Sequence, residues 1–258
     1  MALQIGRAFQ DGIDRFLSER GAVFAGAFIV LGLVNGIVWA SLSQSLVELF
    51  IGSLPSGAQA QAAMGNTTPL AFDIPLAVAA VGALVLFVAN EALNIVAIRA
   101  FASDTTDPVP DNVGRRLGKT VAVAIAAGIL TAIAVGVGFI LLVIPGLVLA
   151  LLFFFVRQEI ALNDSGVIES ISNSIGIVSD NLVPAAVLFI VLGALGIGIG
   201  LAFGLLPLSL GPMVSTTVST VLSSLVGVFS IAVTTVAYLQ ATDSGADSAF
   251  ETESVGGL

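Results

Sequence analysis

Three polar residues lie close together inside a long apolar stretch of the chain. Glu91 is flanked by Asn90 and Asn94, so the three side chains fall within about one helical turn. A charged group at the centre of a bilayer costs about 2.5–3.5 kcal/mol on insertion scales, so it needs a partner or a function. One interpretation is a proton or cation site, or a contact to a substrate. The other is structural: Glu91 pairs with an Arg or Lys near the inner surface, or stays protonated against an asparagine of another helix.

The other reactive residue types do not form a catalytic set. The chain has no Cys and no His, which excludes disulfides, thiolate metal sites and a Ser-His-Asp triad. A Ser-Lys pair would need Lys119, which lies in a basic segment outside the apolar stretches. No glycine-rich phosphate loop occurs, and no acidic cluster in an apolar stretch has metal-ligand spacing. We therefore expect a non-enzymatic protein without a cofactor or a metal ion.

Long apolar stretches must position these polar residues. Hydrophobic residues make up 57% of the chain and charged residues 10%, whereas a soluble domain has about 25% charged residues. Apolar side chains can face outward only where lipid replaces water. The sequence thus predicts an all-α, multi-pass protein of the cell membrane with six transmembrane helices. The predicted spans cover about residues 22–42, 74–98, 120–142, 146–162, 184–206 and 213–239.

The eight cationic residues all lie on one side of these spans. They are Arg7, Arg15, Arg20, Arg99, Arg115, Arg116, Lys119 and Arg157. By the positive-inside rule, both termini are predicted to be cytoplasmic. Residues 1–20 are predicted to be an amphipathic cytoplasmic segment, either an interfacial helix or a plain cap of the first span. Residues 21–240 hold the six-span domain, and the acidic tail, 241–258, is predicted to be disordered.

The charge balance indicates which partners to expect. A net charge of −9 with a single Lys argues against nucleic-acid binding and is typical of a salt-loving archaeon. Membrane lipids are the expected partners, and residues 115–119 either hold anionic head groups or only set the topology. Residues 43–73, between the first two predicted spans, form a long segment that is predicted to lie outside the cell. It contains an acceptor pattern for N-glycosylation at Asn66-Thr67-Thr68.

Glycine and proline positions predict how the helices meet. Residues 120–156 carry no charge, and one helix of that length would be about 55 Å long, so Pro145 and Gly146 are predicted to form a hairpin turn. Small residues four apart permit close helix packing, within the chain or in a homo-oligomer. These packing positions are Gly32, Gly36, Gly196, Gly200 and Gly204. Asn35, beside the first pair, is predicted to form a hydrogen bond between helices and is a further candidate for the intramembrane polar site with Glu91, Asn90 and Asn94.

The motif that follows the hairpin resembles a known family. After residues 144–146 and an apolar span come Glu159, Asp164, Gly166, Glu169, Ser170 and Ser174, before a new span at Pro184. This stretch resembles the six-helix membrane domains found beside some glycerophosphodiester phosphodiesterases, and stand-alone bacterial and archaeal membrane proteins of similar layout. The resemblance implies architecture and a link to lipid metabolism or the envelope. It does not imply the phosphodiesterase activity, which belongs to a separate soluble domain, and residues 163–181 are more acidic than in the relatives.

Two functional hypotheses follow. The first is a non-enzymatic integral membrane protein of the cell envelope that binds or organises lipids. The alternative is a small permease or channel with a path through Glu91, Asn90, Asn94 and a hydroxyl-bearing face of the last span. That face consists of Thr216, Thr220, Ser223, Gly227, Ser230 and Thr234, and helix packing explains it equally. A cavity between Glu91 and this face would favour the permease.

Overall fold

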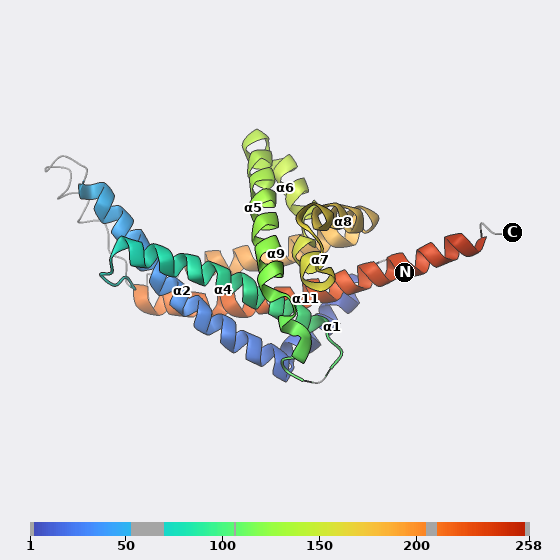
Figure 1. Cartoon of the computed structure of the whole chain (residues 1–258), viewed down its shortest axis with the longest axis horizontal. Coiled ribbons are helices and arrows are strands. Elements are labelled where there is room, and N and C mark those ends of the chain that lie inside the picture. Colours follow the sequence, from blue (N-terminus) through green and yellow to red (C-terminus); the bar gives the residue numbers. More distant parts are fainter. Residues whose placement is uncertain (1–2, 53–69, 106, 205–210, 256–258) are drawn as a thin grey trace. The chain divides into compact units, whose positions relative to one another are not determined.

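The computed structural model describes residues 3–52, 70–105, 107–204 and 211–255, and within these ranges it is helical, without strands (Figure 1). The helices are α1 (Ile5–Leu17), α2 (Glu19–Gly52), α4 (Leu76–Ala102), η1 (Asp111–Gly114), α5 (Leu117–Leu141), α6 (Val143–Leu152), α7 (Val156–Asn163), α8 (Val167–Asp180), α9 (Leu182–Gly204) and α11 (Pro212–Val255). The asparagine of the glycosylation pattern, Asn66, and most of the segment between the last two predicted spans, residues 207–212, lie outside the described residues.

Six helical segments are long and apolar enough to cross a membrane, which confirms the predicted all-α, six-span class. They are Glu19–Ile51, Leu76–Ala102, Leu117–Leu141, Val143–Asn163, Leu182–Ala202 and Met213–Asp243. At a rise of 1.5 Å per residue, each is about 30 Å long or more, the thickness of the hydrocarbon core. The cytoplasmic placement of the two termini stays a prediction.

Two boundaries differ from the sequence-based prediction. The helix of the first span extends beyond the predicted end of the span near residue 42, since α2 reaches Gly52. In place of a disordered tail from residue 241, α11 continues as helix to Val255. Alanine, glutamate and other residues compatible with helix follow the last span, and proline, which would stop a helix, does not occur after Pro212.

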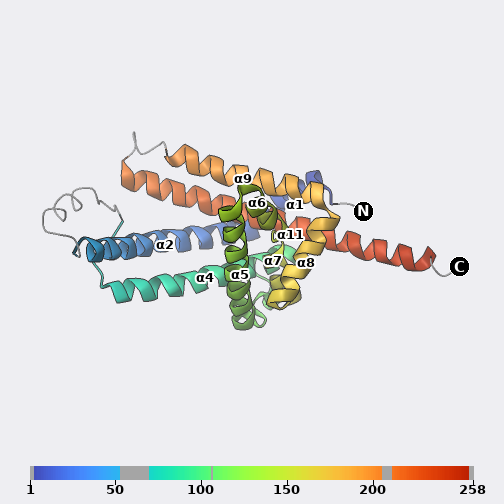
Figure 2. The ribbon, with the colours of Figure 1, turned by 90° about the horizontal axis from the view of Figure 1, so that it is seen from above.

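The hairpin between α5 and α6 turns at Leu142, three residues before the predicted proline (Figure 1 and Figure 2). Leu142 alone is extended, with φ −163° and ψ 149°. Pro145 is the third residue of α6, where a backbone N–H has no partner inside the helix, so its missing donor costs little. Pro145 therefore begins a helix, and the prediction that Pro145 and Gly146 form the turn was wrong.

Gly146 allows the two helices of the hairpin, α5 and α6, to pack closely against each other. A Cβ atom on Gly138 of α5 would lie 2.9 Å from the Gly146 Cα atom, and one on Gly146 would lie 2.6 Å from the Phe139 ring. Such distances are closer than carbon atoms can pack. The absence of side chains at both positions lets the arms of the hairpin meet backbone to backbone.

Gly138→Ala is therefore expected to destabilise the protein by about 1–3 kcal/mol, because the new methyl group meets backbone that cannot move aside. Gly136→Ala is the matched control: no atom of the described chain lies within 4 Å of its added Cβ. It should leave stability unchanged or raise it by up to about 1 kcal/mol through helix propensity. Thermal unfolding in detergent, followed by circular dichroism, makes the comparison. Equal melting of the two variants would contradict the close contact.

The chain divides into two compact units. The boundaries between the units fall inside four helices, α2, α4, α9 and α11. The first comprises Met1–Phe24, Glu91–Gly196 and Val226–Leu258, and the second Ala25–Asn90 and Ile197–Leu225. In the first unit α1 packs as part of the protein core. Its Ala8 is fully buried, and a Cβ atom on Gly12 would lie 2.6 Å from Cγ2 of Val233. The amphipathic segment thus buries one face against α11 and exposes Asp11 and Asp14 on the other.

The second unit contains one of the predicted glycine contacts. A Cβ atom on Gly32 would lie 3.0 Å from the Ser224 hydroxyl oxygen, and this hydroxyl lies 3.3 Å from the carbonyl oxygen of Phe28, so α2 and α11 approach closely there. Gly36 has no such neighbour, and Asn35 is partly buried. On α9, Gly196 and Gly200 are exposed without a close neighbour in the described chain. The surroundings of Gly204 lie outside the described side chains, and the homo-oligomer stays a prediction.

The motif residues of 159–174 build the corner between α7 and α8. Helix α6 ends at Leu152, and the Ser174 hydroxyl fills the break by donating to the Leu152 carbonyl at 2.8 Å and accepting from the Phe155 N–H at 3.2 Å. At the start of α8, the Gly166 N–H donates to the Glu169 carboxylate at 3.1 Å. The break after Leu152 needs such partners because Phe155 and Ser174 are fully buried, whereas the hydrogen bond between Gly166 and Glu169 is exposed. These residues therefore have structural roles in this chain.

Candidate functional site

Glu91 is paired with Arg157. The carboxylate lies on α4 and is 3% exposed, and the guanidinium comes from α7. Arg157 donates from Nε to one carboxylate oxygen at 3.0 Å and from Nη2 to the other at 3.1 Å. Two parallel hydrogen bonds of this kind fix both the distance and the plane of the two groups. The pair compensates the buried charge of Glu91, as the structural interpretation of this residue requires.

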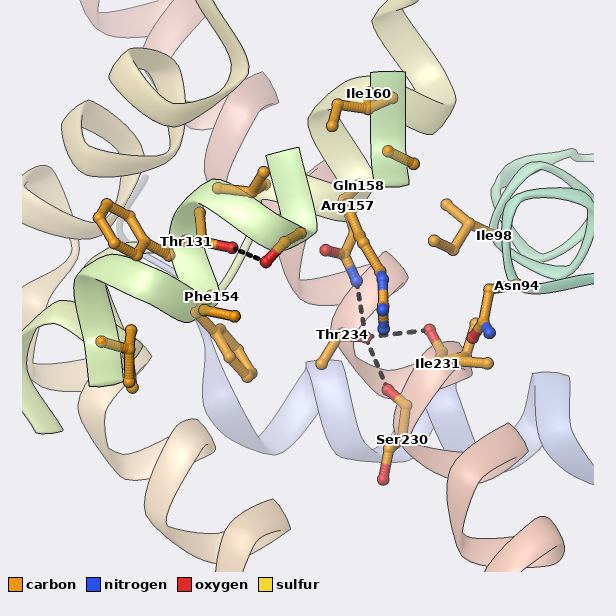
Figure 3. A pocket seen from close by; sticks show the side chains of 17 residues that line it. Asn94, Ile98, Thr131, Phe154, Arg157, Gln158, Ile160, Ser230, Ile231 and Thr234 are labelled. Atoms are coloured by element: carbon orange, nitrogen blue, oxygen red, sulfur yellow. Dashed lines mark hydrogen bonds between the residues drawn. The ribbon is translucent and has the colours of Figure 1, made fainter. Parts of the chain in front are cut away.

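A cavity of about 420 Å³ lies beside this pair, inside the first unit (Figure 3). Its wall is formed by residues of α4, α5, α6, α7 and α11, all within the membrane-spanning segments. The polar side chains of the wall are those of Asn94, Thr131, Arg157, Gln158, Ser230 and Thr234. The apolar part includes Ile98, Ala132, Val135, Phe154 and Ile231. The cavity is thus amphipathic, which is the character of a site for an amphiphilic molecule.

Arg157 has one free end in this cavity. Its Nε and Nη2 atoms face Glu91, and among the described residues none accepts a hydrogen bond from Nη1. The side chain is 55% exposed although Glu91 is almost completely buried. In Figure 3 the Arg157 side chain extends between Gln158 and Ile98 toward Asn94 and Thr234. A guanidinium oriented by a buried carboxylate, with a donor left over, is a ready contact for an anion or for water.

The predicted site residues are only partly brought together. Glu91 and Asn94 belong to the site, but Asn90 is exposed and lies, like Asn35, in the second unit. Of the hydroxyl-bearing face, Ser230 and Thr234 line the cavity. Thr216, Thr220 and Ser223 fall in the second unit. Their helix runs through both units, so a face that is continuous in sequence is divided between them.

A second buried carboxylate lies nearby. Glu159 is 3% exposed and accepts hydrogen bonds from Asn173 at 2.7 Å, from Ser165 at 3.0 Å and from the Tyr238 hydroxyl. Asn163 in turn donates to the Tyr238 oxygen at 2.8 Å. Three helices meet at this carboxylate: α7, α8 and α11. Sequence analysis singled out Glu91 and named Glu159 only as a motif residue, because Glu159 lies four residues before the end of its apolar segment.

Arg99 holds together the polar end of this unit. Its guanidinium donates to the carbonyls of Ala161 at 2.7 Å, Val113 at 2.9 Å and Arg115 at 2.6 Å. It also donates to the Thr120 hydroxyl at 3.1 Å and to the Asp164 carboxylate at 2.8 Å. All three of its nitrogens are used, and the residue is 7% exposed. Arg99 is therefore a structural residue, and it leaves no donor for a ligand.

Comparison with protein families identifies the family of the chain, and that family has no assigned function. A domain of unknown function, DUF7847, matches residues 3–241. The chain belongs to the DUF7847 family. The match includes the whole cavity wall and both buried carboxylates, so the site lies within the family's own domain. The search of curated proteins and the search of solved structures each found no match.

Proposed function

We propose that this DUF7847 protein is a non-enzymatic, lipid-binding protein of the cell membrane, and that its cavity takes the head group of an anionic lipid at Arg157. One observation carries the proposal. A half-exposed guanidinium, oriented by a buried carboxylate, lies at the wall of an amphipathic cavity between membrane-spanning helices. Ionisable residues within spans face cavities or partners and mark the places where ligands bind.

The chemistry of the wall favours a lipid over a small ion. Nη1 of Arg157 can donate a hydrogen bond to a phosphate oxygen, since guanidinium groups bind phosphates through directed hydrogen bonds. The same cavity is also lined by Ala132, Val135 and Phe154, which offer contacts to hydrocarbon. A lone inorganic anion would leave that apolar surface facing water.

Thermal unfolding with short-chain lipids tests the proposal. A ligand that binds only the folded protein raises its melting temperature. Dioctanoyl phosphatidylglycerol should raise the melting temperature of the purified chain in detergent, and dioctanoyl phosphatidylcholine, which has no net charge, should raise it much less. The probe variant is Glu91→Gln/Arg157→Met, which removes the cation without leaving Glu91 unpaired. It should lose the difference between the two lipids.

Two further measurements distinguish the binding of an anionic lipid from the binding of a small free anion. Glu91→Gln alone keeps Arg157 and removes its competing anion, so it should bind phosphatidylglycerol at least as tightly as the parent chain. Free glycerol 3-phosphate should have little effect, because it makes no contact with the apolar wall. Equal shifts by the two lipids, or an unchanged preference in the double variant, would refute the proposal.

A permease is the second candidate, and one observation favours it. The cavity does bring Asn94 together with Ser230 and Thr234 of the predicted hydroxyl face. Solute flux into proteoliposomes, compared between the parent chain and Glu91→Gln, tests it. A gradient-dependent flux that is abolished in Glu91→Gln, together with stabilisation by free glycerol 3-phosphate, would replace lipid binding by transport.

A further inference from the structure

Gln158, next to Arg157 on α7, has an unmet hydrogen-bond acceptor at the cavity. The residue lines the cavity and is only 6% exposed. Its Nε2 atom donates to the Thr234 hydroxyl oxygen at 3.0 Å. Its Oε1 atom is buried and accepts no hydrogen bond from any described residue. Buried polar atoms are normally satisfied, and an unsatisfied acceptor costs about 1–3 kcal/mol.

The surroundings fix which end of the amide is free. The Thr234 hydroxyl already lies 2.7 Å from the Ser230 carbonyl oxygen, to which it donates. It can therefore accept from Gln158 Nε2 but has no second hydrogen to give to Oε1. Figure 3 shows the Gln158 amide above Thr234, with the Arg157 side chain beside it. Among the described residues, Nη1 of Arg157 is thus an unpaired donor and Oε1 of Gln158 an unpaired, buried acceptor, and both residues line the cavity.

We infer that Gln158 makes the cavity selective for anionic lipids whose head group carries a free hydroxyl. This inference rests on the proposed lipid-binding function. The head-group phosphate accepts from Arg157, and a hydroxyl of the same head group donates to Gln158 Oε1. An ammonium group is a poorer donor here, because it would lie next to the guanidinium of Arg157 and be repelled by it. The ligand class is therefore that of phosphatidylglycerol rather than that of amine-bearing lipids.

A pair of lipids that differ only in hydroxyl groups tests the inference. Dioctanoyl phosphatidylglycerol and dioctanoyl phosphatidylpropanol carry the same single negative charge and the same chains, but the second lacks both head-group hydroxyls. Dissociation constants follow from the melting temperature at rising lipid concentration. The parent chain should bind phosphatidylglycerol about fivefold to tenfold more tightly, the value of one hydrogen bond to a neutral group.

Gln158→Met is the decisive variant. Methionine keeps the length of the side chain and removes the unsatisfied oxygen, so the variant should be as stable as the parent chain. It should bind phosphatidylpropanol as before and lose the preference for phosphatidylglycerol. Thr131→Val is the matched control: its hydroxyl lies on the same wall but already donates to the Ala127 carbonyl at 2.8 Å. This control should keep the preference.

The outcomes separate the inference from the function on which it rests. Equal affinity of the parent chain for the two anionic lipids, or an unchanged preference in Gln158→Met, would overturn the role of Gln158 while lipid binding stands. Failure of both lipids to bind the parent chain would refute the proposed function itself. A preference lost in Gln158→Met and kept in Thr131→Val would establish the inference.

Discussion

Arg157→Met is expected to be among the most damaging single substitutions in the chain. It leaves the Glu91 carboxylate 3% exposed and without its cation. Removing one partner of a buried pair costs about 3–5 kcal/mol, because the remaining charge is desolvated and uncompensated. Loss of the salt bridge as such contributes less, since the Arg157 side chain is 55% exposed. The penalty therefore comes from Glu91 rather than from the lost attraction.

A double-mutant cycle measures this distinction. Glu91→Gln should cost less than Arg157→Met, because the guanidinium that remains can turn toward the cavity. Glu91→Gln/Arg157→Met should recover most of the stability that Arg157→Met loses, which gives a large coupling between the two positions. Thermal or denaturant unfolding in one detergent supplies the four values. Arg116→Gln, which changes an exposed cation, is the control and should melt like the parent chain. If the double variant were no more stable than Arg157→Met, Glu91 would not be the cause of the loss.

The fold followed from the sequence because the membrane imposes simple rules on length and charge. Each predicted span corresponds to an observed apolar helical segment, of which the fourth consists of α6 and α7, since about 20 apolar residues are needed to cross hydrocarbon. The hairpin turn was misplaced for a local reason. Proline is tolerated in the first turn of a helix as well as in a loop, and Pro145 lies in the first turn of α6 and not in the hairpin turn.

The site was only half visible in the sequence. Glu91 stands out in an apolar stretch, but its partner is separated from it by 66 positions along the chain, and only the packing of α4 on α7 brings the two together. Gln158 was overlooked because an uncharged polar residue beside an arginine resembles the edge of a span. Its role depends on a missing hydrogen bond, which no sequence pattern records. The signal that was available was Arg157 itself, six residues inside the end of its apolar segment.

Arg99→Met is expected to have a still larger effect, through a different mechanism. Arg99 donates five hydrogen bonds that connect α4 to the start of α5, to the end of α7 and to Asp164. Its loss leaves buried carbonyl groups unsatisfied, and it leaves Asp164 with the Thr120 hydroxyl at 3.3 Å and a single described cation, Arg115, at 3.6 Å. Each orphaned group costs about 1–3 kcal/mol, so the sum is expected to prevent stable folding. Lysine keeps the charge but not the planar fork, so Arg99→Lys should lower the melting temperature and still fold.

The comparison of Arg99→Lys with the cavity variants separates scaffold from site. Arg99 does not line the cavity beside Glu91. The folded fraction of Arg99→Lys should therefore keep the parent chain's preference for phosphatidylglycerol over phosphatidylpropanol, although it melts at a lower temperature. Gln158→Met should behave in the opposite way, with normal melting and no preference. Measuring both properties on both variants decides the matter: a loss of lipid preference in Arg99→Lys would mean that selectivity follows overall stability and not the groups on the cavity wall.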